Sequence, residues 1–284
     1  MPPYAKKSLG QHFLKHDHIC DRIAALAHAT SDDWIIEIGP GPGALTRAVE
    51  RLPHARLFLL EKDERFARER QQEAADSTQA VLTDALRFPW ARLSSARSWK
   101  ILGNLPYNVA SPMIWDMAAQ CRALRRAVFM VQKEVGQRLA AVPGNGQYGA
   151  LSVWVQSYWK PRMEFIVGPG AFSPPPKVDS AVLSFEPLPQ DCLPRHPEAL
   201  ARLIKLFFQQ RRKQLGSIAR RAPWPGIPEA LADAGVDARL RPEQLTVADF
   251  QRICDGWSWG IEQSNRPNRV LFAENKEKTC PDEA

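Results

Sequence analysis

The stretch best suited to chemistry is Asn104-Leu105-Pro106-Tyr107, which follows a short apolar segment ending at Gly103. The Asn104 side chain offers a carbonyl acceptor, and Pro106 biases Leu105 towards an extended conformation that can aim its carbonyl outwards as a second acceptor. Tyr107 adds a face for stacking. Together these groups could hold a planar base with an exocyclic amine. Taken alone, they fit equally well with a turn that caps a following helix.

A glycine-rich turn at residues 39–43 follows the apolar segment 34–38 and precedes an expected helix. A strand, a glycine-rich turn and a helix begin many nucleotide-binding α/β sheets, because glycines allow close approach to a ligand and the helix N-terminus offers free N–H groups. Gly39, Gly41 and Ala44 also satisfy the dinucleotide-binding pattern. An NAD enzyme and an S-adenosylmethionine enzyme are therefore both open at this point.

Three acidic residues lie at or near the expected ends of strands. Glu61 follows the apolar segment 57–60 and could bind the ribose hydroxyls of either cofactor. Asp84 follows the segment 80–82 and could accept a hydrogen bond from an adenine amine. Glu37 precedes the glycines, where a ligand with sulfonium and ammonium charges tolerates a carboxylate and a pyrophosphate does not, which favours S-adenosylmethionine. Glu61 and Asp84 could instead cap the helices that follow their strands.

A proline-rich loop, Phe172-Ser173-Pro174-Pro175-Pro176-Lys177-Val178, lies between segments 165–167 and 181–185, which we expect to be closing antiparallel strands. Three prolines stiffen the loop and predict an exposed Phe172 with little freedom left to lose. Such a ring would form a good second wall for a flat ligand. The alternative is a connector in which Phe172 packs into the core.

The order of the elements predicts an α/β domain followed by helices. Further strands are expected at 100–103 and 127–131, with helices at 17–28, 109–120, 133–140 and 148–158. A proline-rich linker at 187–197 then precedes helices at 198–210, 212–221, 228–234 and 242–254. We expect the α/β domain to span 1–188 and a small helical domain 189–259, with a disordered tail at 260–284.

Charge indicates the kind of partner. The 284 residues carry a formal net charge of +7, and the stretch 199–228 contains basic residues but no Asp or Glu. A patch of one sign predicts a polyanion such as RNA, although a mildly basic enzyme without such a partner is the alternative. The candidate RNA contacts are Arg202, Lys205, Arg211, Arg212, Lys213, Arg220 and Arg221, together with Lys6, Lys7 and Lys15.

Other features limit the compartment and the class of site. The five cysteines are scattered without Cys-x-x-Cys spacing, which argues against a disulfide framework and a zinc site. Three histidines near the start, His12, His16 and His18, fall at the entrance of an expected helix, and we expect no metal site. The sequence contains no apolar run of about 18 residues, so we expect no membrane span. We expect a cytoplasmic protein that acts as a monomer, since one broad surface suffices for RNA.

Four motifs in order resemble one family, the ribosomal RNA adenine N6,N6-dimethyltransferases, and most nearly its bacterial small-subunit type. The motifs are GQHFL at 10–14, EIGPGPGALT at 37–46, NLPYNVASP at 104–112 and FSPPPKVDSAVL at 172–183. The resemblance covers residues 6–256. It implies a Rossmann-like, seven-stranded methyltransferase domain dependent on S-adenosylmethionine, followed by a small all-helical domain.

The resemblance also implies roles for particular residues. In such proteins one set of residues holds the methyl donor, and Tyr107 and Phe172 would stack on either side of the target adenine. His12 stands where the family commonly has Asn, and both side chains can form hydrogen bonds. The implied donor residues are His12, Leu14, Gly39, Glu61, Asp84 and Asn104, and the implied base residues are Asn104, Leu105, Tyr107 and Phe172.

The implied reaction is dimethylation of two adjacent adenines near the 3′ end of small-subunit rRNA in the 30S particle, with S-adenosylhomocysteine as the second product. A large-subunit rRNA adenine methyltransferase shares the Asn-Leu-Pro-Tyr motif and is one alternative, although the Pro-rich motif and the helical domain favour the small-subunit type. A ribosome assembly or transcription factor without catalysis is another. A DNA adenine methyltransferase and an NAD oxidoreductase are more distant alternatives.

Overall fold

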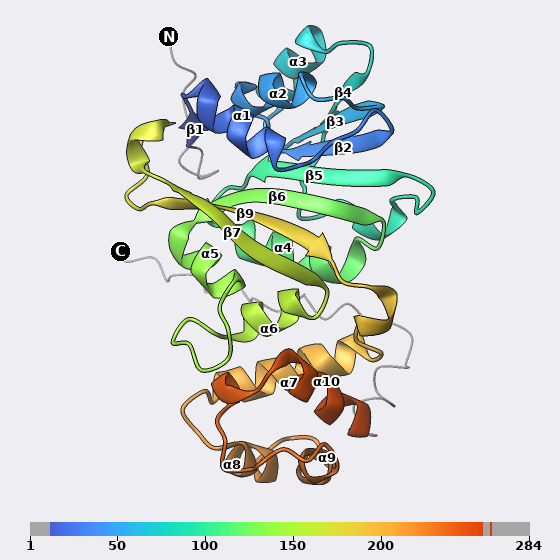
Figure 1. Cartoon of the computed structure of the whole chain (residues 1–284), viewed down its shortest axis with the longest axis vertical. Coiled ribbons are helices and arrows are strands. Elements are labelled where there is room, and N and C mark those ends of the chain that lie inside the picture. Colours follow the sequence, from blue (N-terminus) through green and yellow to red (C-terminus); the bar gives the residue numbers. More distant parts are fainter. Residues whose placement is uncertain (1–11, 258–261, 263–284) are drawn as a thin grey trace, which may run out of the picture.

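The computed structural model describes residues 12–257 and 262, and it contains a seven-stranded sheet in the order β4-β3-β2-β5-β6-β9-β7 (Figure 1). Strands β2 to β6 pair in parallel, and β9 pairs antiparallel with both β6 and β7. The α/β sheet and its seven strands are as predicted. The strands are β2 Asp33–Ile38, β3 Arg56–Glu61, β4 Thr78–Leu82, β5 Ser98–Asn104, β6 Leu124–Gln132, β7 Trp159–Val167 and β9 Ser180–Pro187.

The strand order reverses at β2, which lies between β3 and β5. Ile38 is paired with Leu60 on one side and with Gly103 on the other, so β2, β3 and β5 end at the same level. In open α/β sheets, ligands bind in the crevice beyond the carboxyl ends of the strands at such a reversal. This edge of the sheet is therefore where a site is expected.

Helices cover both faces of the sheet, which is why neighbouring residues of β2 such as Ile35 and Ile36 are both buried. One face packs against α1 and α2, and the other against α4 and α6. Figure 1 shows α1 to α3 on one side of the sheet and α4 to α6 on the other. The bounds are α1 Asp17–Ala25, α2 Ala44–Glu50, α3 Glu64–Glu73, α4 Ala110–Gln120, α5 Lys133–Leu139 and α6 Ala150–Gln156.

The chain continues into four further helices, which lie beyond α6 at one end of the molecule (Figure 1). Their buried side chains join the same core cluster as those of α4 and α6. The expected helix at 242–254 is divided, because Thr246 forms a capping box with Asp249 and α10 starts after it. The helices are α7 Pro197–Gln209, α8 Leu215–Arg220, α9 Ile227–Asp233 and α10 Val247–Gly256.

A second sheet joins the start of the described chain to the proline-rich loop. It has two short antiparallel strands, β1 Phe13–Leu14 and β8 Phe172–Ser173, with Leu14 opposite Phe172. The Lys15 N–H extends this pairing by donating to the Ala171 carbonyl at 2.9 Å. Short 3-10 turns complete the described chain at Trp90–Arg92, Pro169–Ala171, Gln190–Cys192 and Pro242–Gln244.

Some predictions concern segments outside the described residues. Lys6, Lys7 and nearly all of the tail 260–284 lie there. In the described part of the chain, no helix has the length and apolar character needed to cross a membrane.

Candidate active site

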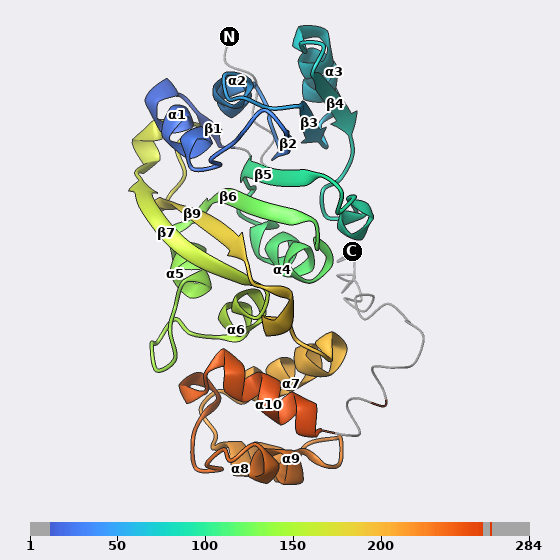
Figure 2. The same cartoon turned by 45° about the vertical axis from the view of Figure 1, so that its right-hand side comes forward.

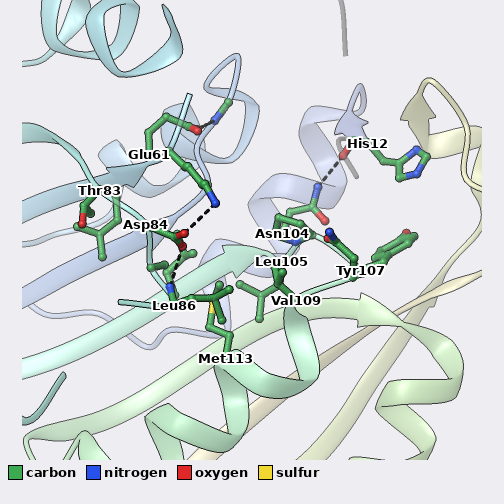
Figure 3. Close-up of a pocket in the computed structure, with 18 of the residues that line it drawn as sticks. His12, Glu61, Thr83, Asp84, Leu86, Asn104, Leu105, Tyr107, Val109 and Met113 are labelled. Atoms are coloured by element: carbon green, nitrogen blue, oxygen red, sulfur yellow. Dashed lines mark hydrogen bonds and ion pairs between the residues drawn. The ribbon is translucent and has the colours of Figure 1, made fainter. Parts of the chain in front are cut away.

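A cleft of about 150 Å³ opens at the carboxyl edge of the sheet, where β2 to β5 end (Figure 3). It brings together side chains that are far apart in the sequence. Most of the expected donor residues line it, as do two further residues of the expected base pocket, whereas Leu14 and Phe172 do not. The predicted residues in the lining are His12, Gly39, Glu61, Asp84, Asn104, Leu105 and Tyr107.

The glycine-rich turn forms one side of the cleft. Gly39 has φ +67°, a left-handed conformation that favours glycine, and a Cβ at this position would meet no atom within 4 Å. Its N–H donates to the Leu60 carbonyl at 2.9 Å. At Gly43, by contrast, a Cβ would lie 2.1 Å from Nη1 of the buried Arg70. The Arg70 side chain, which no sequence pattern indicated, thus packs against the turn at Gly43. Next to Gly39 the turn leaves open space.

Glu61 ties this turn to β3. Its Oε2 accepts from the Gly41 N–H at 3.0 Å and its Oε1 from the Asp63 N–H at 2.8 Å. The side chain is only 5% exposed, and burial raises the pKa of Glu61. The carboxylate still has acceptor capacity for ribose hydroxyls. The helix-cap alternative for Glu61 is wrong, because Asp63 caps α3 by accepting from the Arg65 N–H at 3.1 Å.

Asp84 lies across the cleft from the glycine turn, after β4. Its Oδ2 accepts from Lys62 Nζ at 2.8 Å and its Oδ1 from the Leu86 N–H at 3.0 Å (Figure 3). Burial opposes ionisation, but these hydrogen bonds outweigh it and lower the pKa of Asp84. The bond to Leu86 closes a local turn and not a helix cap. Asp84 therefore presents a carboxylate, and Lys62 is a partner that no sequence signal indicated.

The position of Glu37 corrects one argument made from the sequence. Alternation along β2 turns Glu37 to the face covered by α2, where it is 1% exposed and does not line the cleft. Burial raises the pKa of Glu37 to about 8, although the nearby Thr46 hydroxyl on α2 opposes the rise. A carboxyl group in this position cannot meet the charges of a ligand in the cleft. The electrostatic reason for preferring S-adenosylmethionine at Glu37 is therefore wrong.

The Asn104 amide has a defined orientation. Its Nδ2 donates to the main-chain carbonyl of His12 at 2.8 Å (Figure 3). Because a carbonyl can only accept, the nitrogen must face His12 and Oδ1 remains as the acceptor. The capping alternative holds for the turn but not for the Asn104 side chain, because the Pro106 carbonyl accepts from the N–H groups of Val109 and of Ala110, the first residue of α4.

Leu105 is anchored by its own backbone. Its N–H donates to the Met130 carbonyl at 3.0 Å and so continues the pairing of β5 with β6. Among the described residues no hydrogen bond to the Leu105 carbonyl is found. This carbonyl and Asn104 Oδ1 are thus two acceptors on adjacent residues at the wall of the cleft.

Tyr107 is held by contacts at its hydroxyl and at its ring. The hydroxyl forms a 2.6 Å hydrogen bond with Ser180 Oγ, and the ring stacks on the His12 imidazole with centroids 5.4 Å apart and planes inclined by 28°. His12 Nδ1 in turn lies 2.8 Å from the Pro174 carbonyl. Rings at this distance are already in contact, so a base can stack on this face of Tyr107 only after His12 moves.

Phe172 differs from its prediction. It is 1% exposed, and its side chain joins the core cluster that contains Leu14 and Val182. The pairing of β8 with β1 accounts for this, because it turns Leu14 and Phe172 together into the core beneath α1. The prediction of an exposed wall is wrong, and the core-packed alternative is what the structure has.

The basic stretch lies on α7, on α8 and in the turns beside them, and none of it lines the cleft. Arg211 is committed to structure, since it pairs with Glu243 and its Nη2 donates to the Gly146 carbonyl at 2.7 Å. Arg202 is half-buried. The exposed members are Lys205, Arg212, Lys213, Arg220 and Arg221. Lys15, which directly follows β1, is also exposed.

Comparisons with known proteins show which family this chain resembles. The family model described as ribosomal RNA adenine dimethylase matches residues 4–256. Ribosomal RNA small subunit methyltransferase A of Nitratidesulfovibrio vulgaris is 54% identical over 253 residues, which are 88% of this chain and 95% of that protein. The protein of the same name from Oleidesulfovibrio alaskensis is 51% identical over 256 residues, 89% of this chain and 91% of that protein.

Solved structures share the fold. A dimethyladenosine transferase from Plasmodium falciparum superposes with a TM-score of 0.74 at 24% identity, covering 85% of this chain and 96% of that chain. The 23S rRNA methyltransferase ErmE superposes with a TM-score of 0.65 at 22% identity, covering 87% and 99%. These likenesses confirm the predicted Rossmann-like methyltransferase fold, and the sequence matches confirm the resemblance drawn from the four motifs. The chain belongs to the ribosomal RNA adenine dimethylase family.

Proposed function

We propose that this protein dimethylates N6 of two adjacent adenosines near the 3′ end of small-subunit rRNA, in the 30S particle, with S-adenosylmethionine as methyl donor. The observation that carries the proposal is the Asn104 amide, whose Oδ1 is left as an acceptor beside the donor cleft by the bond from Nδ2 to His12. Family membership supports the reaction, and the names of the relatives, ribosomal RNA small subunit methyltransferase A, support the choice of subunit.

The cleft suits the donor. Gly39 leaves open space for a ligand against the backbone, and two carboxylates end adjacent strands. Glu61 has acceptor capacity for ribose hydroxyls, and the ionised Asp84 can accept from an adenine amine. When bound, S-adenosylmethionine supplies a methyl group on a positive sulfur. The residues proposed to hold it are His12, Leu14, Gly39, Glu61, Asp84 and Asn104, with Leu14 acting through its backbone because its side chain is in the core.

The acceptor end favours nitrogen as a nucleophile. The lone pair of adenine N6 is delocalised into the ring, which makes the amine a poor nucleophile. Asn104 Oδ1 and the Leu105 carbonyl can each accept one N6–H bond, which favours a pyramidal nitrogen with its lone pair aimed at the cleft. Orientation then supplies much of the acceleration. The nitrogen loses its proton after it gains the methyl group, so no strong base is required before attack.

The target base has to leave its stack in the RNA, at a cost of a few kcal/mol that stacking on Tyr107 offsets in part. Tyr107 is the proposed stacking surface. Phe172 would reach the base only by leaving the core cluster in which it is buried. The exposed basic residues of 202–221 and Lys15 are proposed to contact the RNA backbone. A cytoplasmic monomer remains our prediction.

The proposal is tested by incubating the protein with radiolabelled S-adenosylmethionine and 30S subunits that lack the modification. We expect N6,N6-dimethyladenosine to form on the 30S subunits. Label on 50S subunits alone would favour the large-subunit alternative. Calorimetry with S-adenosylhomocysteine tests the alternative of a non-catalytic assembly factor, because such a protein would bind RNA without measurable affinity for this product.

A further inference from the structure

A second cavity lies at the opposite edge of the sheet from the cleft. It has a volume of about 590 Å³ and is lined by residues near the start of β5 and β6 and after the end of β9. Lys100 lines this cavity and Asn104 lines the cleft, so the two sites are separated along β5 by four residues, about 13 Å. Part of its lining, Pro187 to Gln190, belongs to the segment that leads from β9 to α7, and Figure 2 shows the course of the chain between these two elements.

The lining of this basic cavity is strongly cationic. Lys100, Arg122, Arg125 and Arg126 contribute positive charge, His28 adds an imidazole, and Glu186 is the only acidic side chain that the described part of the chain places in the lining. Glu186 is already engaged, because its Oε1 lies 2.6 Å from Arg126 Nη1. Lys100 Nζ lies 3.7 Å from Asp33 Oδ2. Two arginines remain with positive charge that no carboxylate offsets.

These two arginines are Arg122, in the connection between α4 and β6, and Arg125, near the start of β6. Both are exposed, and within the described residues no ion pair to either is found. The Arg122 guanidinium lies 5.2 Å from the centroid of the Tyr158 ring, and this cation–π contact with a buried ring holds it at the cavity wall. Arg126 is fixed by Glu186 and by its bond to the Leu26 carbonyl. Of the three guanidinium groups at the cavity, those of Arg122 and Arg126 are therefore held in place by these contacts.

Guanidinium groups recognise phosphate oxygens through paired hydrogen bonds. We propose that the basic cavity binds phosphate groups of the RNA backbone and forms an anchor separate from residues 202–221. This inference rests on the proposed function, since it takes the substrate to be RNA. The same chemistry would serve a free nucleotide or polyphosphate. RNA is favoured because it is the polyanion that the proposed function supplies, and the one carboxylate that the described residues place in the lining is already paired with Arg126.

The test compares two double variants of the full-length protein with equal changes of charge. Arg122→Glu with Arg125→Glu alters the cavity, and Arg65→Glu with Arg68→Glu alters an exposed pair on α3 that lines neither site. Binding to unmodified 30S subunits is measured by filter binding at several salt concentrations. We expect the cavity variant to bind roughly 10- to 100-fold more weakly than the control variant, with a salt slope smaller by about 1.5, as for two lost phosphate contacts.

Further measurements separate the other outcomes. Equal weakening in the two double variants, or an unchanged salt slope in the cavity variant, would overturn the proposal. Wild-type protein is also titrated with pyrophosphate and ATP by calorimetry. Saturable binding that the cavity variant loses, while its affinity for 30S subunits stays at the control level, would assign the cavity to free phosphates and overturn the RNA anchor.

Thermal unfolding and affinity for S-adenosylhomocysteine should match between the variants, and Arg122→Gln with Arg125→Gln replaces the charge reversal if folding fails. RNA affinity is measured without turnover. A failure of the proposed methylation would therefore leave this result interpretable.

Discussion

At the scale of residues, Asn104 is expected to contact both substrates, because its Oδ1 is at the wall of the cleft and its Nδ2 is fixed by the His12 carbonyl. Asn104→Ala removes the acceptor for N6–H and the bond that orders the strand end. We expect kcat to fall by about 10²- to 10³-fold, as for loss of one preorganised polar group in a transition state. Single-turnover methylation of 30S subunits measures this loss.

The matched control for Asn104 is the affinity for 30S subunits, which depends mainly on phosphate contacts and should change less than about twofold. Retained methylation by Asn104→Ala, with the fold intact by circular dichroism, would remove the role assigned to this amide.

His12 supports a second prediction, because its ring covers a face of Tyr107 that a base could use. His12→Ala frees that face and keeps the main-chain carbonyl that orients Asn104. We expect KM for 30S subunits to fall by about threefold to tenfold, since a stack and a hydrogen bond no longer compete with the base. His12→Phe, which keeps a ring, should not lower KM. The affinity of His12→Ala for S-adenosylhomocysteine is measured as well: weaker binding would support the proposed donor contact of the imidazole, and unchanged binding would remove it.

Glu37 makes stability depend on pH. Burial raises its pKa to about 8 in the folded protein, whereas an ordinary Glu in the unfolded chain titrates near about 4.3. Between these values the native state binds more protons than the unfolded state, so this group lowers stability as pH rises and has no further effect above about pH 8. Glu37→Gln should remove that loss. Relative to wild type, the variant should gain up to about 4 kcal/mol between pH 5 and pH 8 in denaturant unfolding. An equal difference at both pH values would contradict this.

At the scale of elements, the pairing of β1 with β8 decides what Phe172 does. As a buried core residue, Phe172 should cost about 3–5 kcal/mol of unfolding free energy when replaced by Ala. Urea unfolding at fixed pH measures the change. Val178→Ala in the same loop is the control, because Val178 is 45% exposed and should cost less than about 1 kcal/mol. If Phe172→Ala changed the unfolding free energy little but abolished methylation, the prediction that Phe172 is an exposed wall of the base pocket would be restored.

Much of the cleft could be predicted from the sequence, and the reason is also found at this scale. Gly39, Glu61, Asp84 and Asn104 each follow or end an apolar strand, and the carboxyl ends of parallel strands meet at one edge. The two-residue strands β1 and β8 show no periodicity, so neither their pairing nor the burial of Phe172 could be read from the sequence. Prolines indicate a stiff loop, but they do not indicate which side of the loop is covered.

At the scale of the whole molecule, the cleft and the basic surfaces are separate. The cleft lies at the carboxyl edge of the sheet, whereas the exposed basic residues of 202–221 lie on α7, on α8 and in the turns beside them. Figure 1 shows α7 and α8 beyond α6. This separation fits an enzyme that holds a large RNA at several points and presents one nucleotide to the cleft. The charge run at 202–221 was evident in the sequence. The basic cavity was not, because its residues come from five separate segments of the chain.

The central claim is that Asn104 and its cleft methylate adjacent adenosines in small-subunit rRNA. Mass spectrometry of nuclease fragments from treated 30S subunits tests it most directly, with wild type and Asn104→Ala in parallel. We expect two adjacent N6,N6-dimethyladenosines near the 3′ end of the rRNA with wild type and neither with the variant. Modification elsewhere, or the same two products with Asn104→Ala, would contradict the account.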